Sequence, residues 1–314
     1  MNLHSKETII YRSKFLNAVR KYFCSKGFLE IDTPALKKIP SMEPHLNPFE
    51  VSSPSGNESG YLISSPEYSL KITLSAGIEK VYEIAHTFRS GELGSKVHTA
   101  EFLMLEFYEC DADLSKMMNR TEDLIRSVAK ELDILLDKRP FSRKPVKDLL
   151  KEYANCTWDR EDLERRIVEQ KLSSIPLSEL LYEDCFYLVF LNLVEPSLQK
   201  EYQFIYDYPP EMAALARIEN GVAKRFEMYF GNLEICNAFD ELQDPREQRI
   251  RFEHEQRIRQ TLGKKIFPID MMFLEALERG IPNCSGNALG LDRLFLTLLG
   301  EDSLSQVSPY WKQL

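Results

Sequence analysis

The stretch TFRSGELGSKVHTAEFLMLEFYEC, residues 87–110, decides the fold of this chain. Its start belongs to VYEIAHTFR, whose alternation predicts a strand with one face formed by Val81, Glu83, Ala85, Thr87 and Arg89. The later part, EFLMLEFYEC, predicts a second strand with Glu106 and Tyr108 on one face, because they are two residues apart. We therefore expect two strands joined by a polar loop, with Arg89 at the end of the first.

Around this pair, helical and extended patterns do not alternate one for one. A helix is expected within residues 8–27, followed by the short strand FLEIDTPAL closed by Pro34 and by the extended segment YLISSPEYSLKI. A mostly helical insert around residues 113–198 precedes the extended segments FIYDYPP, RFEMYF and LEICNAF, and helices at 245–262, 273–279 and LDRLFLTLLG close the chain. This order predicts an α+β fold, an antiparallel β-sheet flanked by helices. The dinucleotide, P-loop and serine-hydrolase motifs GxGxxG, GxxxxGK[ST] and GxSxG are absent.

Composition limits the class of protein. With 314 residues and 43% hydrophobic residues, the chain is predicted to form a single domain, 1–314. Its net charge of −9 makes tRNA an unlikely partner, because phosphate binding relies on clustered basic residues. No apolar run approaches the ~20 residues of a membrane helix, and the N-terminus has no signal-peptide core. Six scattered cysteines favour a reducing, cytoplasmic location.

The segment RFEMYFGNLEICNAFDEL predicts a tight hairpin that turns at residues 231–232. In that register Tyr229 faces Glu234, and Glu227 faces Cys236. Cross-strand partners share a face, so the two glutamates should point the same way.

Two carboxylates this close repel each other unless a cation lies between them, and Mg²⁺ carrying phosphates would suit Glu227 and Glu234. The alternative is a pair of solvated glutamates on the sheet face. Asn237 and Glu241 do not fit the same register, so a bulge or bend is needed to bring them to the same place.

Three further features each allow two interpretations. NCSGNALGLDRLFLTLLG predicts a strand that ends in a turn and opens a helix with Arg293 in its first turn, which is either an anion site or a cap paired with Asp292. Glu106 beside Tyr108 is either an ammonium site or a surface salt-bridge face. His98, in the loop between the first two strands, either touches a nucleotide or is polar loop surface.

Taken together, these motifs resemble those of class II aminoacyl-tRNA synthetases. TFRSGELG followed by HTAEFLMLEFY resembles motif 2, ALGLDRL resembles motif 3, and the helix ending in GFLEIDTPAL resembles motif 1 with its proline at Pro34. SPEYSLK and LEICNAFDEL are similar to the lysine-pocket segments of lysyl-tRNA synthetases. Over nearly its whole length the chain resembles the lysyl-tRNA synthetase paralogues that modify elongation factor P, which lack the anticodon-binding domain. As in them, Ala288 stands where lysyl-tRNA synthetases usually have glycine.

The resemblance implies a class II synthetase catalytic fold and an ATP-dependent ligase. The enzyme would activate lysine or (R)-β-lysine to the acyl-adenylate and transfer it to a lysine side chain of elongation factor P. Two alternatives remain: a lysyl-tRNA synthetase-like core that aminoacylates tRNA, and a non-catalytic paralogue that senses lysine or nucleotide. The helix within residues 8–27 and the motif 1 strand resemble dimer-forming segments, which implies a homodimer.

The resemblance also implies a role for each matching residue. Arg89 would contact the ATP α-phosphate and the substrate carboxylate, and Arg293 the γ-phosphate. Mg²⁺ would be carried by Glu227 and Glu234. Adenine would lie near Phe102, which stacks on it, and near His98 and Glu101. The amino acid would be held by Glu67 at an amino group, by Glu106, Tyr108 and Glu241 at the distal ammonium, by Asn237 at the carboxylate, and would lie against Ala288.

The chain departs from the family pattern at several positions near these residues. Ser90 replaces the asparagine of FRN, and Thr99 and Ala100 replace the asparagine and proline of HNPEF. Ala100 removes a stiffening proline, which puts the rigidity of the ATP loop in doubt. Ala238 replaces a glycine, and its extra methyl group is expected to alter the fit of the substrate.

Overall fold

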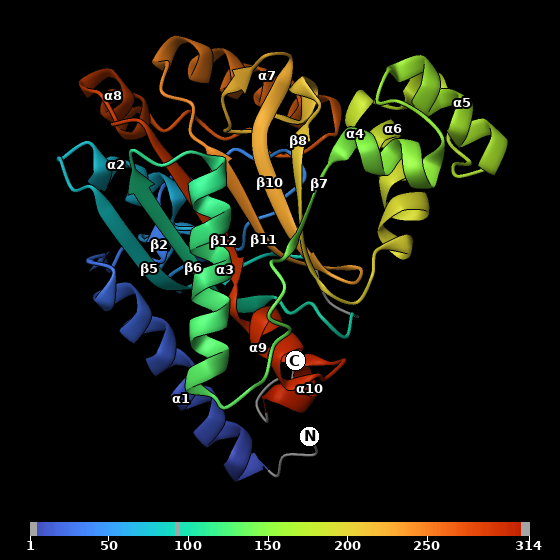
Figure 1. The fold of residues 1–314 in the computed structure, drawn as a ribbon. Helices are drawn as coiled ribbons and strands as arrows, with labels where there is room; N and C mark the ends of the chain where they lie inside the picture. Colours follow the sequence, from blue (N-terminus) through green and yellow to red (C-terminus); the bar gives the residue numbers. More distant parts are fainter. Residues whose placement is uncertain (1–4, 92–94, 309–314) are drawn as a thin grey trace. The chain divides into compact units, whose positions relative to one another are not determined.

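The structure, a computed structural model, describes residues 5–91 and 95–308 (Figure 1). The chain divides into two compact units, one formed by Met1–Asp137 with Leu242–Leu314 and the other by Lys138–Glu241. Each unit contains strands and helices, so the predicted α+β class is confirmed. The assignment of residues 1–314 to a single domain stays a prediction.

The main strands of the first unit lie in the order β1-β5-β6-β12. Their bounds are Leu29–Glu30, Lys80–Phe88, Glu101–Cys110 and Cys284–Gly290. β5 and β6 are the two strands predicted from residues 81–110, and they pair antiparallel from Lys80 opposite Glu109 to Phe88 opposite Glu101. β6 and β12 are also antiparallel, whereas β1 and β5 run parallel, so the sheet is not purely antiparallel as predicted.

One face of these strands is covered by α1 (Ser5–Ser25) and α3 (Leu114–Glu131) (Figure 1). The ring of Phe23 on α1 stacks on Tyr82 with centroids 4.6 Å apart and lies 5.0 Å from Phe107. From the same face, Asn287 Nδ2 donates to Thr121 Oγ1 of α3 at 2.7 Å. Since side chains alternate along a strand, the residues between these, Glu83 and Glu106 among them, point to the opposite face.

The segment SPEYSLKI was predicted to be extended, but most of it is helical. It enters α2, Glu67–Leu74, whose N-cap is Pro66. Leu70 and Leu74, four residues apart, are buried on one side of this helix, and Lys71 reaches Glu67 one turn earlier. Burial at helical spacing therefore outweighed the β-type residues of the segment.

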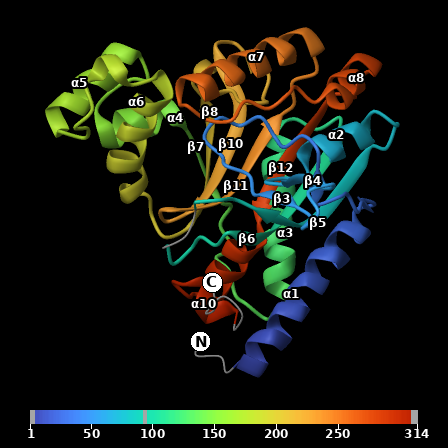
Figure 2. The same ribbon diagram turned by 180° about the vertical axis from the view of Figure 1, so that it is seen from behind.

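The predicted strand FLEIDTPAL is also shorter than expected. Only β1 forms before Pro34, and β2 (Leu36–Lys37) follows in a separate three-stranded sheet with β4 (Ser59–Leu62) and β3 (Glu50–Ser52) (Figure 2). Proline has a fixed φ and no N–H, so the ladder cannot continue through it.

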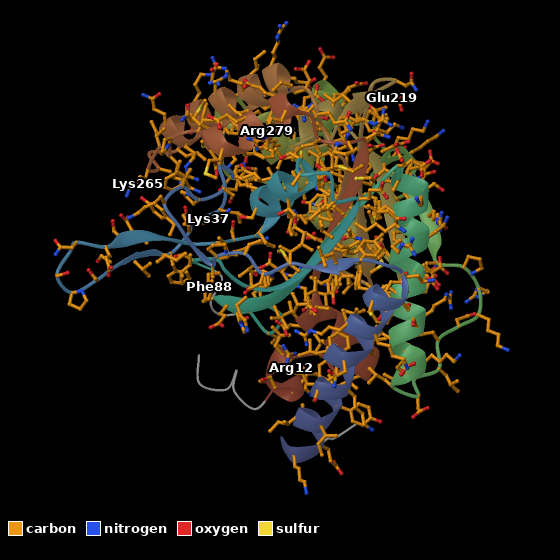
Figure 3. All side chains as sticks on the ribbon, turned by 90° about the vertical axis from the view of Figure 1, so that its left-hand side faces the viewer. Arg12, Lys37, Phe88, Glu219, Lys265 and Arg279 are labelled. Atoms are coloured by element: carbon orange, nitrogen blue, oxygen red, sulfur yellow. The ribbon has the colours of Figure 1, made fainter. Side chains whose placement is uncertain are left out.

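The C-terminal helices complete the first unit. They are α7 (Pro245–Thr261), α8 (Met271–Arg279), α9 (Leu291–Leu299) and α10 (Leu304–Val307). The first three correspond to predicted helices, and α9 begins directly after β12, as the NCSGNALGLDR pattern indicates. Lys265, labelled in Figure 3, follows α7 and donates to both carboxylate oxygens of Glu50 at 2.9 Å.

In the second unit the strand order is β11-β10-β8-β7, with β9 paired to β10. Their bounds are Leu233–Asp240, Val222–Phe230, Tyr202–Tyr208, Ser142–Pro145 and Ile218–Glu219. Short helices pack beside them: α4 (Val146–Leu149), α5 (Arg160–Gln170) and α6 (Tyr182–Val189). Single turns occur at Leu150–Ala154, Leu177–Glu179, Phe190–Val194, Glu195–Ser197 and Pro210–Met212.

The predicted helical insert around residues 113–198 is thus interrupted by β7, and its first helix, α3, belongs to the first unit. None of the helices in residues 5–91 and 95–308 has the length and apolarity needed to cross a membrane.

Candidate active site

A row of three residues crosses the face of the first unit's sheet that is opposite to α1 and α3. Glu106 on β6 lies opposite Glu83 on β5 and opposite Ala288 on β12. Directly opposite residues have Cβ atoms about 5 Å apart. The methyl group of Ala288 therefore borders the Glu106 carboxylate, as expected if both line one binding site.

Glu106 belongs to a group of five residues that we call the carboxylate cluster, four of them buried and Ser65 half-buried: Ser65, Glu67, Lys71, Glu106 and Tyr108. Tyr108 OH donates to Glu106 Oε1 at 2.5 Å, and Ser65 Oγ donates to Glu106 Oε2 at 2.6 Å. Ser65 Oγ also accepts from the Glu67 N–H at 3.0 Å, which fixes the start of α2 beside Glu106. The surface salt-bridge interpretation of Glu106 and Tyr108 is wrong, because both side chains are about 98% buried.

This environment changes the acidity of Glu106. Burial, followed by repulsion from Glu67, raises the pKa of Glu106 to about 8, while hydrogen bonds from Ser65 and Tyr108 and the charge of Lys71 lower it. Burial also raises the pKa of Glu83, which accepts from the N–H and hydroxyl of Thr33. A carboxyl group held this way is poised to lose its proton when a cation arrives.

Arg89 and Phe102 come together where β5 ends and β6 begins. The Arg89 guanidinium carbon lies 5.1 Å from the centre of the Phe102 ring. Within the described part of the chain, the buried Nε atom of Arg89 has no hydrogen-bond acceptor. A buried guanidinium N–H without an acceptor is costly, so this arrangement suits an anion bound from outside.

Hydrogen bonds hold the two ends of the loop between β5 and β6 in place. Arg89 N–H donates to Ala100 O, and Ser90 N–H donates to Asn47 O, both at 2.9 Å. Thr99 Oγ1 donates to the carbonyl of Glu101 at 2.5 Å. These bonds hold the ends of the loop despite the substitutions at Ser90, Thr99 and Ala100, while its tip, residues 92–94, lies outside the described residues.

Arg293 lies in the first turn of α9, as predicted, and its Nε donates to Val97 O at 3.4 Å. The preceding Asp292 is not its capping partner. Asp292 Oδ1 pairs at 2.6 Å with Arg12 of α1, which is labelled in Figure 3, and Oδ2 accepts from Leu103 N–H at 2.7 Å. The buried Asp292 carboxylate joins α1, β6 and α9. It therefore fixes the position of the first turn of α9, which carries Arg293.

The two other predicted adenine neighbours have local partners. His98 Nδ1 lies 2.8 Å from Ser95 Oγ, and Glu101 Oε1 lies 2.8 Å from His86 Nδ1. Both pairs are near solvent, so either side chain can turn toward a ligand at little cost.

In the second unit, the predicted hairpin forms with Tyr229 opposite Glu234. The expected pairing of Glu227 with Cys236 is wrong: Glu227 lies opposite Asn237, and Met228 lies opposite Cys236. A β-bulge between the pairs Met228–Cys236 and Tyr229–Glu234 inserts one extra residue. This is the irregularity that the sequence required for Asn237 to share a face with Glu227.

Glu227 is held by a network that the sequence did not predict. Its Oε1 accepts from Arg225 at 2.5 Å, and its Oε2 accepts from Tyr208 at 2.7 Å and Tyr229 at 2.8 Å. Burial lowers the pKa of Arg225, but the charge of Glu227 together with those of neighbouring tyrosines and Glu234 raises it above its usual range. Arg225 also donates to Asn237 Oδ1 at 3.2 Å.

These contacts bear on the predicted magnesium site. Both oxygens of Glu227 are already engaged by three donors, so this carboxylate fits a metal only by giving up Arg225 or a tyrosine. The described residues contain no group of three or more His, Cys, Asp or Glu side chains that could hold a metal. Glu234 is half-buried beside the bulge, and its role toward phosphate-bound Mg²⁺, which needs only one or two carboxylates, stays a prediction.

Glu241 follows β11 and is 2% exposed, and its backbone forms a bridge with Ala216. The two units thus each bring together a part of the predicted site. Glu67, Glu106, Tyr108 and Ala288 adjoin in the first unit, and Glu227 adjoins Asn237 in the second. That both groups serve one substrate stays a prediction.

Sequence reasoning missed several residues that organise these groups. Ser65 and Lys71 lie in the SPEYSLK segment, and the four-residue spacing of Glu67 and Lys71 was a helix signal that could have revealed the ion pair. Arg225 lies two residues before Glu227, hence on the same strand face, and the bulge was the missing information for its contact with Asn237.

The chain is similar to known proteins over nearly its whole length. The family model described as tRNA synthetases class II (D, K and N) matches residues 1–313. Curated relatives from Salmonella paratyphi A, Salmonella dublin and Proteus mirabilis are each 36% identical over 312 residues, covering 96% of this chain and 94% of the relative. All three are named elongation factor P–(R)-β-lysine ligase.

Proposed function

The chain belongs to the class II tRNA synthetases of the D, K and N type, and from this premise we propose that it ligates lysine or (R)-β-lysine to elongation factor P. It is an ATP-dependent ligase of that family. The observation that carries the proposal is the buried carboxylate cluster around Glu106. Aspartate and asparagine present no cationic side chain, whereas the ammonium group of lysine needs a buried carboxylate and a hydrogen-bonding phenol.

In the first step, a carboxylate oxygen of the amino acid attacks the α-phosphorus of ATP. The new oxygen–phosphorus bond forms as the bond to pyrophosphate breaks, and pyrophosphate leaves with the electron pair. Arg89 would neutralise charge on the α-phosphate and the attacking carboxylate, and Arg293 would hold the γ-phosphate. Phe102 would stack on adenine, with His98 and Glu101 beside it. Mg²⁺, when bound, would neutralise phosphate charge near Glu234.

In the second step, the neutral amine of an acceptor lysine attacks the carbonyl carbon of the acyl-adenylate. The nitrogen–carbon bond forms, AMP leaves, and the amine loses a proton. The amino acid would be held by Glu67 at the amino group nearest the reacting end, by Asn237 at the carboxylate, and by Glu106, Tyr108 and Glu241 at the distal ammonium.

Two features of the setting belong to the same proposal. We place the protein in the cytoplasm, where ATP and the acceptor are found. We also propose a homodimer formed through α1 and the motif 1 strand, because Ile9, Ile10 and Leu29 are 44%, 45% and 50% exposed there.

The acceptor is tested with labelled substrate. Purified protein is given ATP, Mg²⁺ and radiolabelled lysine or (R)-β-lysine, together with either elongation factor P or total tRNA. We expect label on elongation factor P and none on tRNA. Label on tRNA alone would establish a tRNA synthetase instead, and absence of lysine-dependent ATP–pyrophosphate exchange would identify a non-catalytic sensor.

A pH dependence follows from Glu106. Its pKa near 8 means that a proton must leave before an ammonium binds, so lysine affinity is expected to rise about tenfold per pH unit from pH 6 to 8 and then level off. Calorimetric titration across this range measures it. Glu106→Gln should bind weakly with a flat profile, whereas Glu79→Gln, on an exposed residue before β5, should match the wild type. A flat wild-type profile would disprove the assignment.

Glu106 also makes the free energy of unfolding depend on pH. This stability falls as pH rises, whereas lysine affinity rises. Because the folded protein holds the Glu106 proton more tightly than the unfolded chain does, the stabilisation is full below pH ~4.5 and is lost as pH rises through about 8.

A further inference from the structure

Lys71 is a lysine buried inside the proposed amino-acid site. Its Nζ lies 2.6 Å from Glu67 Oε1, and its side chain is 3% exposed. The ammonium also lies 6.0 Å from the ring centre of Tyr108 and 5.8 Å from that of Phe273. A carboxylate with two aromatic rings is the environment that recognises an ammonium group, so the protein supplies one of its own next to the place proposed for the substrate.

The charged groups near Lys71 come from α2, β5 and β6, whereas α8 presents the uncharged ring of Phe273 and keeps its charged residues exposed. α2 contributes Glu67, β6 contributes Glu106, and β5 contributes Glu83. Further out are Lys37 of β2, which contacts Ser69 of α2, and Glu255 of α7, which acts on Tyr68. In the carboxylate cluster itself, Lys71 is the only cation opposite two carboxylates, so it offsets one of two buried negative charges.

Without that cation, the buried carboxylates of Glu67 and Glu106 would face each other directly. Two such groups share a proton instead of both ionising. The longer the cluster keeps this proton as pH rises, the more weakly it binds an ammonium, because the proton and the ammonium compete for the same oxygens.

We propose that Lys71 is a positioning residue that sets the charge of the amino-acid site: it holds Glu67 and offsets its charge, so that Glu106 exchanges its proton for the substrate ammonium at a lower pH than it would without Lys71. The proposal rests on the proposed function for the identity of the substrate. It makes Lys71 a determinant of lysine affinity, while the contacts to the substrate come from the carboxylates.

Three variants of the full-length protein test this role. In Lys71→Met the midpoint of the pH profile for lysine binding should move upward by about one unit, and KM for lysine at pH 7 should rise about tenfold with a smaller change in kcat. Lys71→Arg should restore the wild-type midpoint. Lys80→Met is the matched control, because Lys80 pairs with buried Glu109 on the same sheet at 3.4 Å, outside the cluster.

Glu67→Gln provides a second, independent measurement. Removing the repelling carboxylate while Lys71 remains should move the midpoint downward, opposite to Lys71→Met. If Lys71→Met fails to fold, Lys71→Arg and Glu67→Gln still decide the question. The proposal would be overturned if the midpoint of the pH profile in Lys71→Arg differed from that of the wild type. It would also be overturned if the midpoint in Glu67→Gln did not move.

A readout without substrate separates this inference from the proposed function. The carboxyl carbon of Glu106 can be titrated by NMR in ligand-free protein, and its midpoint should shift upward in Lys71→Met and downward in Glu67→Gln. Shifted midpoints without lysine-dependent exchange would uphold the charge-setting role and reject lysine as the substrate. Unshifted midpoints with normal exchange would reject the role of Lys71 alone.

Discussion

Arg89→Ala is expected to reduce lysine-dependent ATP–pyrophosphate exchange by at least about 100-fold. Its guanidinium stacks on Phe102, and its buried Nε has no acceptor within the described residues, so it is held ready for an anion. In the proposed reaction that anion is the α-phosphate, where negative charge builds up in the transition state. Removing a donor at this point costs about 3–4 kcal/mol of barrier.

The matched control for Arg89 is Arg20→Ala. Arg20 lies on α1, pairs with Glu30 at 3.0 Å and is 45% exposed, so its loss should change exchange by less than twofold. Arg89→Lys should recover little, because an ammonium cannot replace the planar fork of the guanidinium. Comparable rates for Arg89→Ala and Arg20→Ala, with both proteins folded by circular dichroism, would rule out the phosphate role.

Glu241→Gln is expected to weaken lysine-dependent exchange by two or more orders of magnitude while ATP binding stays nearly intact. Glu241 is 2% exposed, and a buried ammonium without an ionised partner is strongly disfavoured. The amide keeps the size of the side chain and removes its charge, so the loss should appear in KM for lysine. Exchange kinetics and equilibrium dialysis with ATP measure the two effects.

Glu219→Gln is the corresponding control in the second unit. Glu219 lies on β9, is 46% exposed and pairs with Arg217 at 3.0 Å (Figure 3). Its substitution should leave both measurements unchanged. If Glu241→Gln exchanges pyrophosphate at the wild-type rate, Glu241 does not hold the ammonium.

Several residues of the candidate site lie in local elements that were readable from sequence. Alternation in residues 81–110 predicted β5 and β6, and therefore that Glu106 and Tyr108 share a face. The NCSGNALGLDR pattern predicted a strand leading into a helix that begins near Arg293. These succeeded because strand alternation and helix starts are local properties, fixed by neighbouring residues along the chain.

Sequence reasoning failed where a local signal competed with packing. The segment containing Glu67 was expected to be extended, and it is helical because one side of α2 is buried. The register at Glu227 was wrong by one residue, because a bulge is an irregularity in the pairing of two strands.

By itself, the sequence determined the fold class, the strand faces and the residue types gathered at the candidate site. The tertiary structure alone decided which charges meet. In the tertiary structure Lys71 forms an ion pair with Glu67, and Arg225 forms one with Glu227. Asp292 pairs with Arg12 rather than with Arg293. The physical reason is that a buried charge must find a partner in space, and the partner comes from whichever element packs against it.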